Sequence, residues 1–241
     1  MMQSEFSEFD FVKGEVLLFD KPYGPTSFSI VNRVRGIIKR KLKVKNIKVG
    51  HAGTLDPLAT GLLVICTGKA TKTISSIQDA EKEYTGTITI GATTPSYDLE
   101  TEVNETFPVE HITDELIRKT ATEMVGEHHQ MPPIFSAKQV DGKRAYDLAR
   151  AGKDVKLNTK LVTIKEFEVT AISKNSETIK VDFRVACSKG TYIRSVAYDF
   201  GKAVNSGGYL SALRRTKIGK FNVEDAINTD QFQALLHGDQ A

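Results

Sequence analysis

The sequence predicts an α+β fold with a mixed, largely antiparallel central sheet flanked by helices. Segments with the alternation of strands and segments with helical periodicity interleave along the chain, but without the regular strand–helix–strand rhythm that builds a parallel sheet. The length of 241 residues, with 40% hydrophobic and 26% charged residues, suits a globular protein with one large core or two modest ones.

The expected elements follow from apolar spacing and from capping residues. Thr26 or Ser27 can cap a helix whose apolar side chains recur at helical spacing as far as Leu42. In chain order, we expect strands at residues 15–19, 62–66, 83–91, 161–172, 178–186 and 208–217, and further helices at residues 70–80, 112–125, 191–204 and 230–236. Residues 126–158 carry few apolar anchors, so we interpret them as a loop-rich insertion that can grip a partner.

The distribution of charge indicates a phosphate-bearing partner more clearly than the net charge of +3 does. Residues 39–48 hold six basic and no acidic side chains, and residues 138–160 hold seven basic and three acidic ones. Residues 214–220 add four more basic side chains, whereas residues 97–123 hold eight acidic and two basic ones. A basic run is often only a solvated face, but three such segments favour a positive side that attracts phosphates.

Several classes of protein and site are excluded by the same inspection. No apolar run approaches 18 residues, and the acidic N-terminus does not resemble a secretory signal, so a membrane or secreted role has no support. Cys66 and Cys187 are too few for a disulfide framework and lack zinc-ligand spacing, so we expect buried thiols, no metal and a reducing cytoplasm. The segment from Gly61 to Lys69 lacks the spacing of a P-loop.

The most informative segment is the glycine-punctuated stretch from Gly50 to Gly61, which holds Asp56 before an apolar run. Glycine permits close approaches, and Pro57 biases Asp56 away from the helical region, so we expect a stiff loop that presents a carboxylate. Taken alone, an Asp-Pro pair can also be an ordinary turn in which the carboxylate accepts hydrogen bonds from nearby backbone donors.

The order of residues in this stretch, Gly-His-x-Gly-x-Leu-Asp-Pro-x-Ala-x-Gly, resembles the catalytic motif of the tRNA pseudouridine synthase B (TruB) family. Further segments resemble other motifs of that family in family order: Lys21-Pro22-x-Gly24-x-Thr26-Ser27, Lys82-Glu83-Tyr84, Pro132-Pro133-x-x-Ser136-Ala137-Lys138, Ser188-Lys189-Gly190-Thr191-Tyr192-Ile193-Arg194 and Leu213-Arg214-Arg215-Thr216. The resemblance runs from about residue 14 to residue 221. It implies the pseudouridine synthase fold and isomerisation of the uridine at position 55, in the T-loop of tRNA, to pseudouridine without a cofactor.

The resemblance implies that Asp56 is the nucleophile acting on a flipped-out base. A carboxylate can attack the anomeric carbon of the sugar or carbon six of the ring, and the sequence leaves both routes open. Arg194 is expected to favour the charged carboxylate, unless it is a surface arginine with some other acidic neighbour. Tyr84 is expected to pack against the target base, the alternative being a strand tyrosine with its ring in the core.

The remaining candidate residues are expected to bind the RNA. His51 resembles a family residue that holds the flipped nucleotide stack, although a histidine can also serve in acid–base chemistry. Tyr192 and Leu213 resemble residues that line the pocket. Taken alone, Tyr192 has the same alternative as Tyr84, and Leu213 is better explained as an ordinary core leucine. Lys21 is either a motif lysine near the active site or a turn residue before Pro22. Lys138 and Arg144 belong to the RNA-gripping insertion and complete the set.

We expect an N-terminal extension at residues 1–13 and a catalytic domain at residues 14–241 that contains the insertion at about 126–158. The printed sequence ends soon after the motif at Leu213, so we expect the form of the family that lacks the C-terminal PUA domain of many members. The expected partner is the T-stem-loop of tRNA, with no membrane or metal partner, and the chain is expected to be a monomer. The alternative is a non-catalytic RNA-binding or tRNA-folding protein in which Asp56 is a turn residue.

Overall fold

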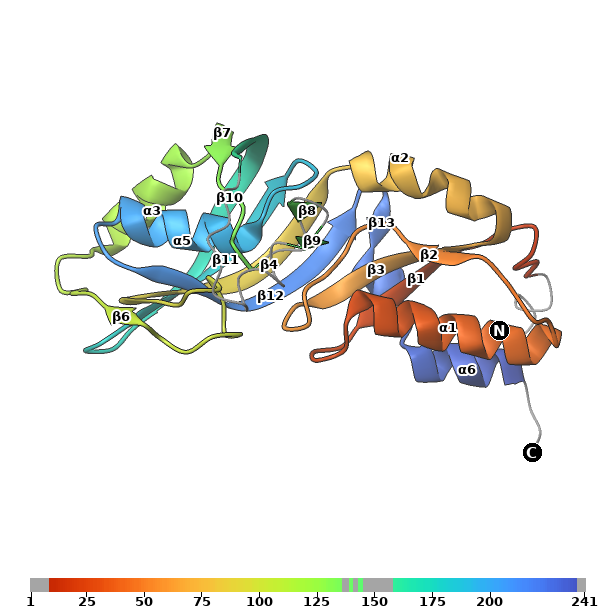
Figure 1. Ribbon diagram of the computed structural model, residues 1–241. Coiled ribbons are helices and arrows are strands. Elements are labelled where there is room, and N and C mark those ends of the chain that lie inside the picture. The colour runs from red at the N-terminus through yellow and green to blue at the C-terminus, as the bar shows by residue number, and fades with distance from the viewer. Residues whose placement is uncertain (1–8, 136–138, 141–142, 145–157, 238–241) are drawn as a thin grey trace. The chain divides into compact units, whose positions relative to one another are not determined.

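The computed structural model describes residues 9–135, 139–140, 143–144 and 158–237 and divides into two compact units (Figure 1). The first unit combines the segments Met1–Lys82 and Arg214–Ala241, and the second unit is the segment Glu83–Leu213. The chain therefore leaves the first unit once and returns to it. The expected boundary between an extension and a single catalytic domain at residue 13 stays a prediction, although Phe11 already packs into the core of the first unit.

The first unit contains a sheet centred on strand β3 (Thr60–Thr67). Strand β1 (Val16–Lys21) pairs with it antiparallel, and so does the short strand β2 (Val49–His51). The last part of strand β12 (Gly208–Ile218) pairs with the start of β3 in parallel, and β13 (Phe221–Asn222) folds back on β12. This combination confirms the prediction of a mixed sheet with mostly antiparallel pairs.

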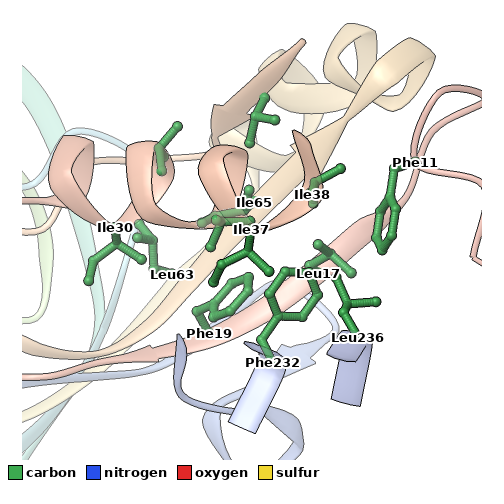
Figure 2. Close-up of a cluster of buried hydrophobic side chains, with 13 residues drawn as sticks. Phe11, Leu17, Phe19, Ile30, Ile37, Ile38, Leu63, Ile65, Phe232 and Leu236 are labelled. Atoms are coloured by element: carbon green, nitrogen blue, oxygen red, sulfur yellow. The ribbon is translucent and has the colours of Figure 1, made fainter. Parts of the chain in front are cut away.

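Helices α1 (Ser27–Leu42) and α6 (Thr229–His237) cover one face of this sheet (Figure 1). The hydroxyl of Thr26 accepts a hydrogen bond from the Ser29 amide at 3.0 Å, which confirms Thr26 as the helix cap. The core beneath the helices brings together side chains from α1, α6, β1 and β3 (Figure 2). Its labelled members are Phe11, Leu17, Phe19, Ile30, Ile37, Ile38, Leu63, Ile65, Phe232 and Leu236.

The opposite face of the same sheet has a smaller core, which contains Leu62 and Val64 of β3. It is covered by helix α2 (Ile74–Asp79), which follows the 3₁₀ turn η2 (Gly68–Thr73), and by the 3₁₀ turn η3 (Val223–Asp225). Because β3 is buried on both faces, its apolar run from Leu62 to Cys66 is continuous and does not alternate.

The second unit contains a sheet in the order β12, β4 (Lys82–Ile90), β11 (Ile179–Cys187), β10 (Lys160–Lys174) and β7 (Gly126–Gln130). Its helices are α3 (Asp114–Glu123) and α5 (Ile193–Ala203). Phe200 of α5 packs against Phe167 of β10 with ring centroids 5.6 Å apart, and Phe167 meets Phe183 of β11 at 5.7 Å. Two small antiparallel pairs complete the described part: β5 (Ala92–Thr93) with β6 (Glu105–Thr106), and β8 (Gln139–Val140) with β9 (Lys143–Arg144).

The long elements agree with the sequence prediction, whereas the insertion needs a correction. Residues 126–130 form the edge strand β7, which pairs antiparallel with β10 from Gly126 opposite Ile164 to Gln130 opposite Lys160. The sequence of β7, Gly-Glu-His-His-Gln, has no apolar side chain, because this strand is half exposed at the sheet edge. The prediction of loop structure was therefore wrong at its start. Both cysteines are buried and neither forms a disulfide, as expected.

Candidate active site

Asp56 lies half-buried in the connection between β2, which ends at His51, and β3, which begins at Thr60. One backbone hydrogen bond ties the start of the connection to β3, and another closes a turn inside it. The Ala52 amide donates to the carbonyl of Val64 at 2.9 Å, and the Ala59 amide donates to the carbonyl of Asp56 at 3.1 Å. We call residues 52–60 the Asp56 loop. Its carboxylate is thus carried on a short backbone segment whose two ends are fixed to the sheet.

Lys21, the last residue of β1, holds the Asp56 loop from one side. Its side chain is fully buried, and its ammonium donates to the carbonyls of Pro22 at 2.9 Å, Pro57 at 3.2 Å and Ala59 at 2.6 Å. Two of these three acceptors belong to the loop. The structure therefore gives Lys21 a positioning role within the first unit, and its expected contact with RNA stays a prediction.

Arg215 of β12 holds the Asp56 loop from the other side. Only 1% of this residue is exposed, although arginine is almost never fully buried without partners. Its guanidinium donates to the carbonyls of Leu62 at 2.8 Å, Gly53 at 3.0 Å and Thr54 at 3.4 Å. Sequence reasoning counted Arg215 among exposed basic residues that attract phosphates, and its burial shows that this interpretation was wrong.

The strand register explains why two cations converge on one loop. Gly61 of β3 pairs with Lys21 of β1 on one side and with Arg215 of β12 on the other. Gly61 has φ of +100°, and a Cβ atom placed on it would lie 2.3 Å from the Arg215 carbonyl oxygen. Only glycine allows both this backbone conformation and the close approach. The Asp56 loop ends at Thr60, and the next residue, Gly61, is the one that lies between Lys21 and Arg215 in the sheet.

The start of helix α1 supplies the remaining ties to the loop. The Ser27 hydroxyl donates to the carbonyl of Leu55 at 3.0 Å and accepts from the amide of Leu55 at 2.8 Å. The Gly24 amide donates to the carbonyl of Pro57 at 2.9 Å. The residues on either side of Asp56 are thus both hydrogen-bonded to the stretch from Gly24 to Ser27, which leads into α1, and this limits where the carboxylate can point.

The electrostatics of the first unit favour an anion on this loop. Burial lowers the pKa of Lys21 to about 8; the charge of Asp56 opposes this shift, and the Arg215 guanidinium adds to it. Burial also lowers the pKa of His51, and the charge of Arg215 lowers it further. A hydrogen bond with the Gly53 backbone raises this pKa, but by less than burial lowers it. His51 is therefore more weakly basic than an exposed histidine, and Lys21 still carries its charge near neutral pH.

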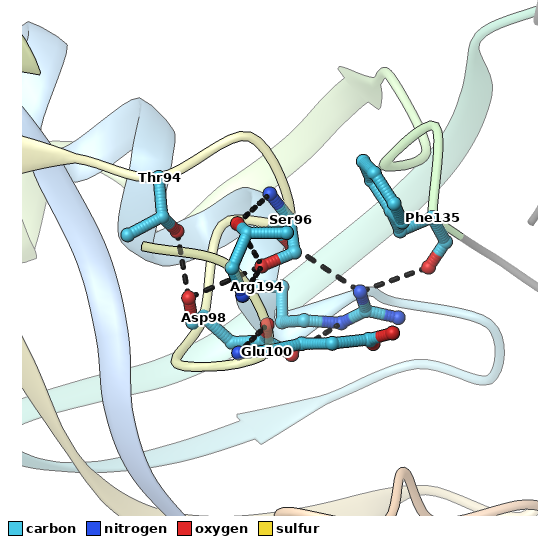
Figure 3. Close-up of polar contacts among 7 residues, drawn as sticks. Thr94, Ser96, Asp98, Glu100, Phe135 and Arg194 are labelled. Carbon is cyan, nitrogen blue, oxygen red and sulfur yellow. Dashed lines mark hydrogen bonds and ion pairs between the residues drawn. The ribbon is translucent and has the colours of Figure 1, made fainter. Parts of the chain in front are cut away.

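In the second unit, Arg194 lies in the first turn of α5 and is 5% exposed (Figure 3). Its guanidinium donates to the carbonyls of Phe135 at 2.9 Å and Ser96 at 3.2 Å, and its Nε lies 3.6 Å from a carboxylate oxygen of Asp98. The alternative, a surface arginine with some other acidic neighbour, is therefore wrong about exposure, but an acidic neighbour is present in Asp98. Asp98 is also buried, so Arg194 is held by a charged partner as well as by carbonyls.

The segment that carries Asp98 is a compact turn stabilised by hydroxyl groups. Thr94 and Ser96 both donate through their hydroxyls to the Asp98 carbonyl, at 2.7 Å and 3.1 Å, and the Glu100 amide donates to the Asp98 carboxylate at 3.0 Å (Figure 3). Tyr97, between them, adopts a positive φ of 63° and stacks on Tyr198 with centroids 4.1 Å apart. Together these contacts fix the carboxylate that pairs with Arg194.

Tyr192 caps the helix that carries Arg194, and a buried glutamine holds it in place. The Gln130 side-chain carbonyl accepts from the Tyr192 amide at 2.7 Å, and its amide group donates to the Tyr192 carbonyl at 3.1 Å. Gln130, at the end of β7, is 5% exposed. Sequence reasoning missed Gln130 and Asp98, because neither a lone Gln nor a lone Asp reveals its distant partner.

The other candidate residues are placed less decisively. Tyr84 is 8% exposed in β4, and Leu213 is half-buried in β12. Both belong to the second unit together with Arg194, whereas Asp56 belongs to the first. The expected meeting of Asp56 with Tyr84 and Arg194 therefore stays a prediction. Lys138 lies outside the described residues, and only the backbone of Arg144 is described, as part of β9.

The basic run at the end of α1 differs from Arg214 and Arg215. Arg214 pairs with the Asp20 carboxylate through two hydrogen bonds of 2.9 Å and 2.8 Å. By contrast, no ion pair is found, within the described ranges, for the exposed cations at the end of α1 and in the following loop. These are Arg40, Lys41, Lys43, Lys45 and Lys48. The segment at residues 39–48 therefore remains able to bind phosphates, whereas in the segment 214–220 the exposed cations are Lys217 and Lys220.

Two further properties of the described residues bear on the chemistry. Across the part of the chain that the structure covers, no group of His, Cys, Asp and Glu side chains is arranged to hold a metal ion. Within the same residues, no helix combines the length and the apolar character needed to cross a bilayer.

Solved structures share this arrangement of elements. The chain resembles a chain from the crystal structure of a Cbf5–Nop10–Gar1 complex with a TM-score of 0.65 and 28% identity over 92% of its length. It also resembles a chain from an H/ACA RNP bound to a substrate RNA containing 2'-deoxyuridine, with a TM-score of 0.64 and 26% identity. The chain spans about half the length of both, 55% and 53%. Its α+β fold is that of the pseudouridine synthases.

Sequence comparison is more specific. Residues 39–193 match the family model described as TruB family pseudouridylate synthase, N-terminal domain. The chain is 55% identical to the tRNA pseudouridine synthase B of Flavobacterium johnsoniae, over 94% of its own length and 98% of that protein. It is also 55% identical to the tRNA pseudouridine synthase B of Phocaeicola vulgatus, over 94% and 95% of the two chains. The chain therefore belongs to the TruB family of pseudouridylate synthases.

Proposed function

We propose that this chain converts the uridine at position 55, in the T-loop of tRNA, to pseudouridine, with Asp56 as the nucleophile. Conversion of uridine to pseudouridine in tRNA follows from membership of the family, whose bacterial relatives named above match this chain over nearly their whole length. The T-loop, position 55 and the role of Asp56 are the parts that we propose.

The observation that carries the role of Asp56 is the way its loop is held. Lys21 and Arg215 are both buried cations, and the hydrogen bonds described above join them to neutral carbonyls, which do not cancel either charge. The half-buried carboxylate of Asp56 lies close enough to Lys21 for their opposite charges to attract each other, so the loop carries its carboxylate beside buried positive charge. An ionised, positioned carboxylate is the form that can act as a nucleophile.

The proposed reaction needs one carboxylate and no redox partner. A carboxylate oxygen of Asp56 attacks the anomeric carbon of the sugar or carbon six of the uracil. The glycosidic N–C bond breaks, the uracil turns and a C–C bond to the sugar forms. The bond to the Asp56 oxygen breaks again and regenerates the carboxylate, while the newly bonded ring carbon loses its proton and the former glycosidic nitrogen gains one. We propose that Arg194 helps to keep the carboxylate charged, that Tyr84 packs against the base, and that Tyr192 and Leu213 line the pocket.

The target uridine must leave the base stack before its glycosidic bond can be reached, which costs a few kcal/mol of stacking. We propose that the exposed cations of residues 39–48 bind the RNA backbone and offset this cost, and that His51 contacts the flipped nucleotide. Lys138 and Arg144 are proposed to contribute from the insertion. Consistent with such a substrate, we also propose that the chain acts in the cytoplasm as a monomer.

The test uses a T-stem-loop transcript and a pseudouridine-specific chemical readout. We expect the wild-type protein to modify one uridine, and Asp56→Ala and Asp56→Asn to bind the RNA with at least a roughly 1,000-fold loss of single-turnover rate, because the nucleophile is gone. The matched control is Asp225→Asn, which removes an exposed carboxylate of the same unit and should leave the rate unchanged.

Two outcomes would contradict the proposal in different ways. Modification by Asp56→Ala at the wild-type rate would exclude Asp56 as the nucleophile. A wild-type protein that binds the transcript tightly but leaves every uridine unmodified would instead favour a non-catalytic RNA-binding or tRNA-folding role.

A further inference from the structure

Two aromatic side chains next to the Asp56 loop are exposed to an unusual degree. Tyr23 is 61% exposed and Phe28 is 64% exposed, while Phe9 and Phe11, also in the first unit, lie in or against its core. Single exposed apolar side chains are common on proteins and need no explanation by themselves. Tyr23 and Phe28 do need an explanation, because each is next in sequence to a residue that is hydrogen-bonded to the Asp56 loop.

Both aromatic residues are adjacent in sequence to the residues that hold the Asp56 loop. Gly24, which follows Tyr23, donates its amide to the carbonyl of Pro57 at 2.9 Å. Ser27, which precedes Phe28, makes its two hydrogen bonds to Leu55, the neighbour of Asp56 on the other side. The two exposed rings therefore branch from backbone that is bonded to both chain neighbours of Asp56.

The charge of the surrounding chain indicates what these rings contact. From Lys21 to Leu55 the chain holds nine Lys or Arg residues and no Asp or Glu. The exposed cations of residues 39–48 lie at the far end of α1, the helix that begins beside the aromatic rings. Exposed aromatic rings combined with a cationic track are the recognition elements for unpaired nucleic acid, in which bases stack on rings and phosphates meet cations.

We propose that Tyr23 and Phe28 form a stacking surface for the RNA nucleotides that flank the isomerised uridine. The inference rests on the proposed function, because it requires RNA to be seated at Asp56. A nucleotide that reaches Asp56 brings its chain neighbours to the edges of the loop, to which the residues next to Tyr23 and Phe28 are hydrogen-bonded. Stacking there holds the neighbouring bases after the target base has left the stack, and it tolerates different bases because every base has a π-face.

The test measures RNA binding and base environment together. Binding is measured in an Asp56→Asn background, so that the RNA is not converted, with T-stem-loops that carry 2-aminopurine next to the target uridine. We expect the double variant Tyr23→Ala and Phe28→Ala to bind roughly 10- to 100-fold more weakly and to lose the 2-aminopurine quenching that the intact rings produce. Folding should be unchanged, because both rings are exposed.

Conservative and control variants separate stacking from general apolar contact. Phe28→Tyr and Tyr23→Phe keep a ring and should bind within about twofold of the parent, whereas Tyr23→Leu and Phe28→Leu keep apolar bulk and should behave like alanine. Val12→Ala removes an equally exposed apolar side chain from the same unit and should change nothing.

Two results would overturn the inference. One is a double alanine variant that binds within about twofold of the parent and keeps the quenching, which would leave the rings free for another class of partner such as a protein. The other is leucine variants that bind as tightly as the aromatic ones. Failure of the proposed function would look different, because wild-type protein would then leave the transcript unmodified regardless of either ring.

Discussion

A buried arginine fixes the Asp56 loop of the first unit, and another fixes the turn that carries Asp98 in the second unit, but the two arginines have different partners. Arg215 donates only to carbonyls among the contacts described above, whereas Arg194 also lies 3.6 Å from the Asp98 carboxylate. A carbonyl satisfies the donors of a guanidinium without cancelling its charge, and a carboxylate does both. The hydrogen bonds of Arg215 therefore leave its charge available to attract an anion on the Asp56 loop, whereas Arg194 forms an ion pair with Asp98.

The largest loss of stability and activity is expected when the hydrogen bonds between Arg215 and its three carbonyl partners are removed. Arg215→Met removes the charge and leaves three buried carbonyls without their donor, so the free energy of unfolding should fall by about 3–5 kcal/mol. The single-turnover rate should fall by roughly 100-fold, because the loop that carries Asp56 loses one of its two cations. Urea unfolding and rapid-quench kinetics measure the two quantities.

Arg215→Lys is the matched control, since it keeps the charge but offers one compact donor group in place of a planar fork. We expect it to be intermediate in both stability and rate. A loss of less than about 1 kcal/mol in Arg215→Met would show that the guanidinium does not hold the loop.

A smaller loss of stability is expected when the ion pair between Arg194 and Asp98 is removed. Asp98→Asn leaves Arg194 buried with carbonyl partners but without its carboxylate, which should cost about 2–3 kcal/mol of unfolding free energy. Glu102→Gln, an exposed carboxylate of the same segment, serves as the control and should change stability by less than about 0.5 kcal/mol. Equal stability of the two variants in urea would contradict a structural ion pair.

The smallest effect concerns pH. The pKa of Lys21 is about 8, so raising the pH through this value removes the proton and with it one of the three hydrogen bonds and the charge beside Asp56. The rate should fall several-fold on that limb of the pH profile. Stability should move the other way: between about pH 8 and 10.5 the unfolded chain binds more protons at this group, so its contribution to unfolding free energy rises with pH.

Lys21→Met tests the assignment, because its side chain is unbranched and uncharged. We expect this variant to be slower at pH 7 and to show no further fall near pH 8. A limb near pH 8 that persists in Lys21→Met would assign the titration to another group.

The elements could be predicted from sequence where a local signal exists. Helix α1 carries both its cap at Thr26 and a complete apolar stripe, and β3 is a continuous apolar run, so both were predicted within about two residues. Strand β7 could not be recognised, because an edge strand with polar residues has neither alternation nor an apolar run. Its only defining feature is its partner, β10, thirty residues further along the chain.

The candidate site was predictable only in part, for a related reason. The glycine and proline pattern around Asp56 is local, and it led to the loop directly. The burial of Arg215 depends on its register with Gly61, a pairing across more than 150 residues that no local pattern encodes. Sequence reasoning therefore placed Arg215 with the exposed cations, because burial of an arginine is rare.

Gly61 illustrates how such a site would mislead a mutational survey. A methyl group at this position would collide with the backbone of Arg215 and force the two strands apart. The guanidinium would then withdraw from the loop, and the enzyme would lose its activity while every residue that touches the RNA was still present. An inactive Gly61 variant would thus show that the spacing between β3 and β12 matters, and it would say nothing about which residues perform the reaction.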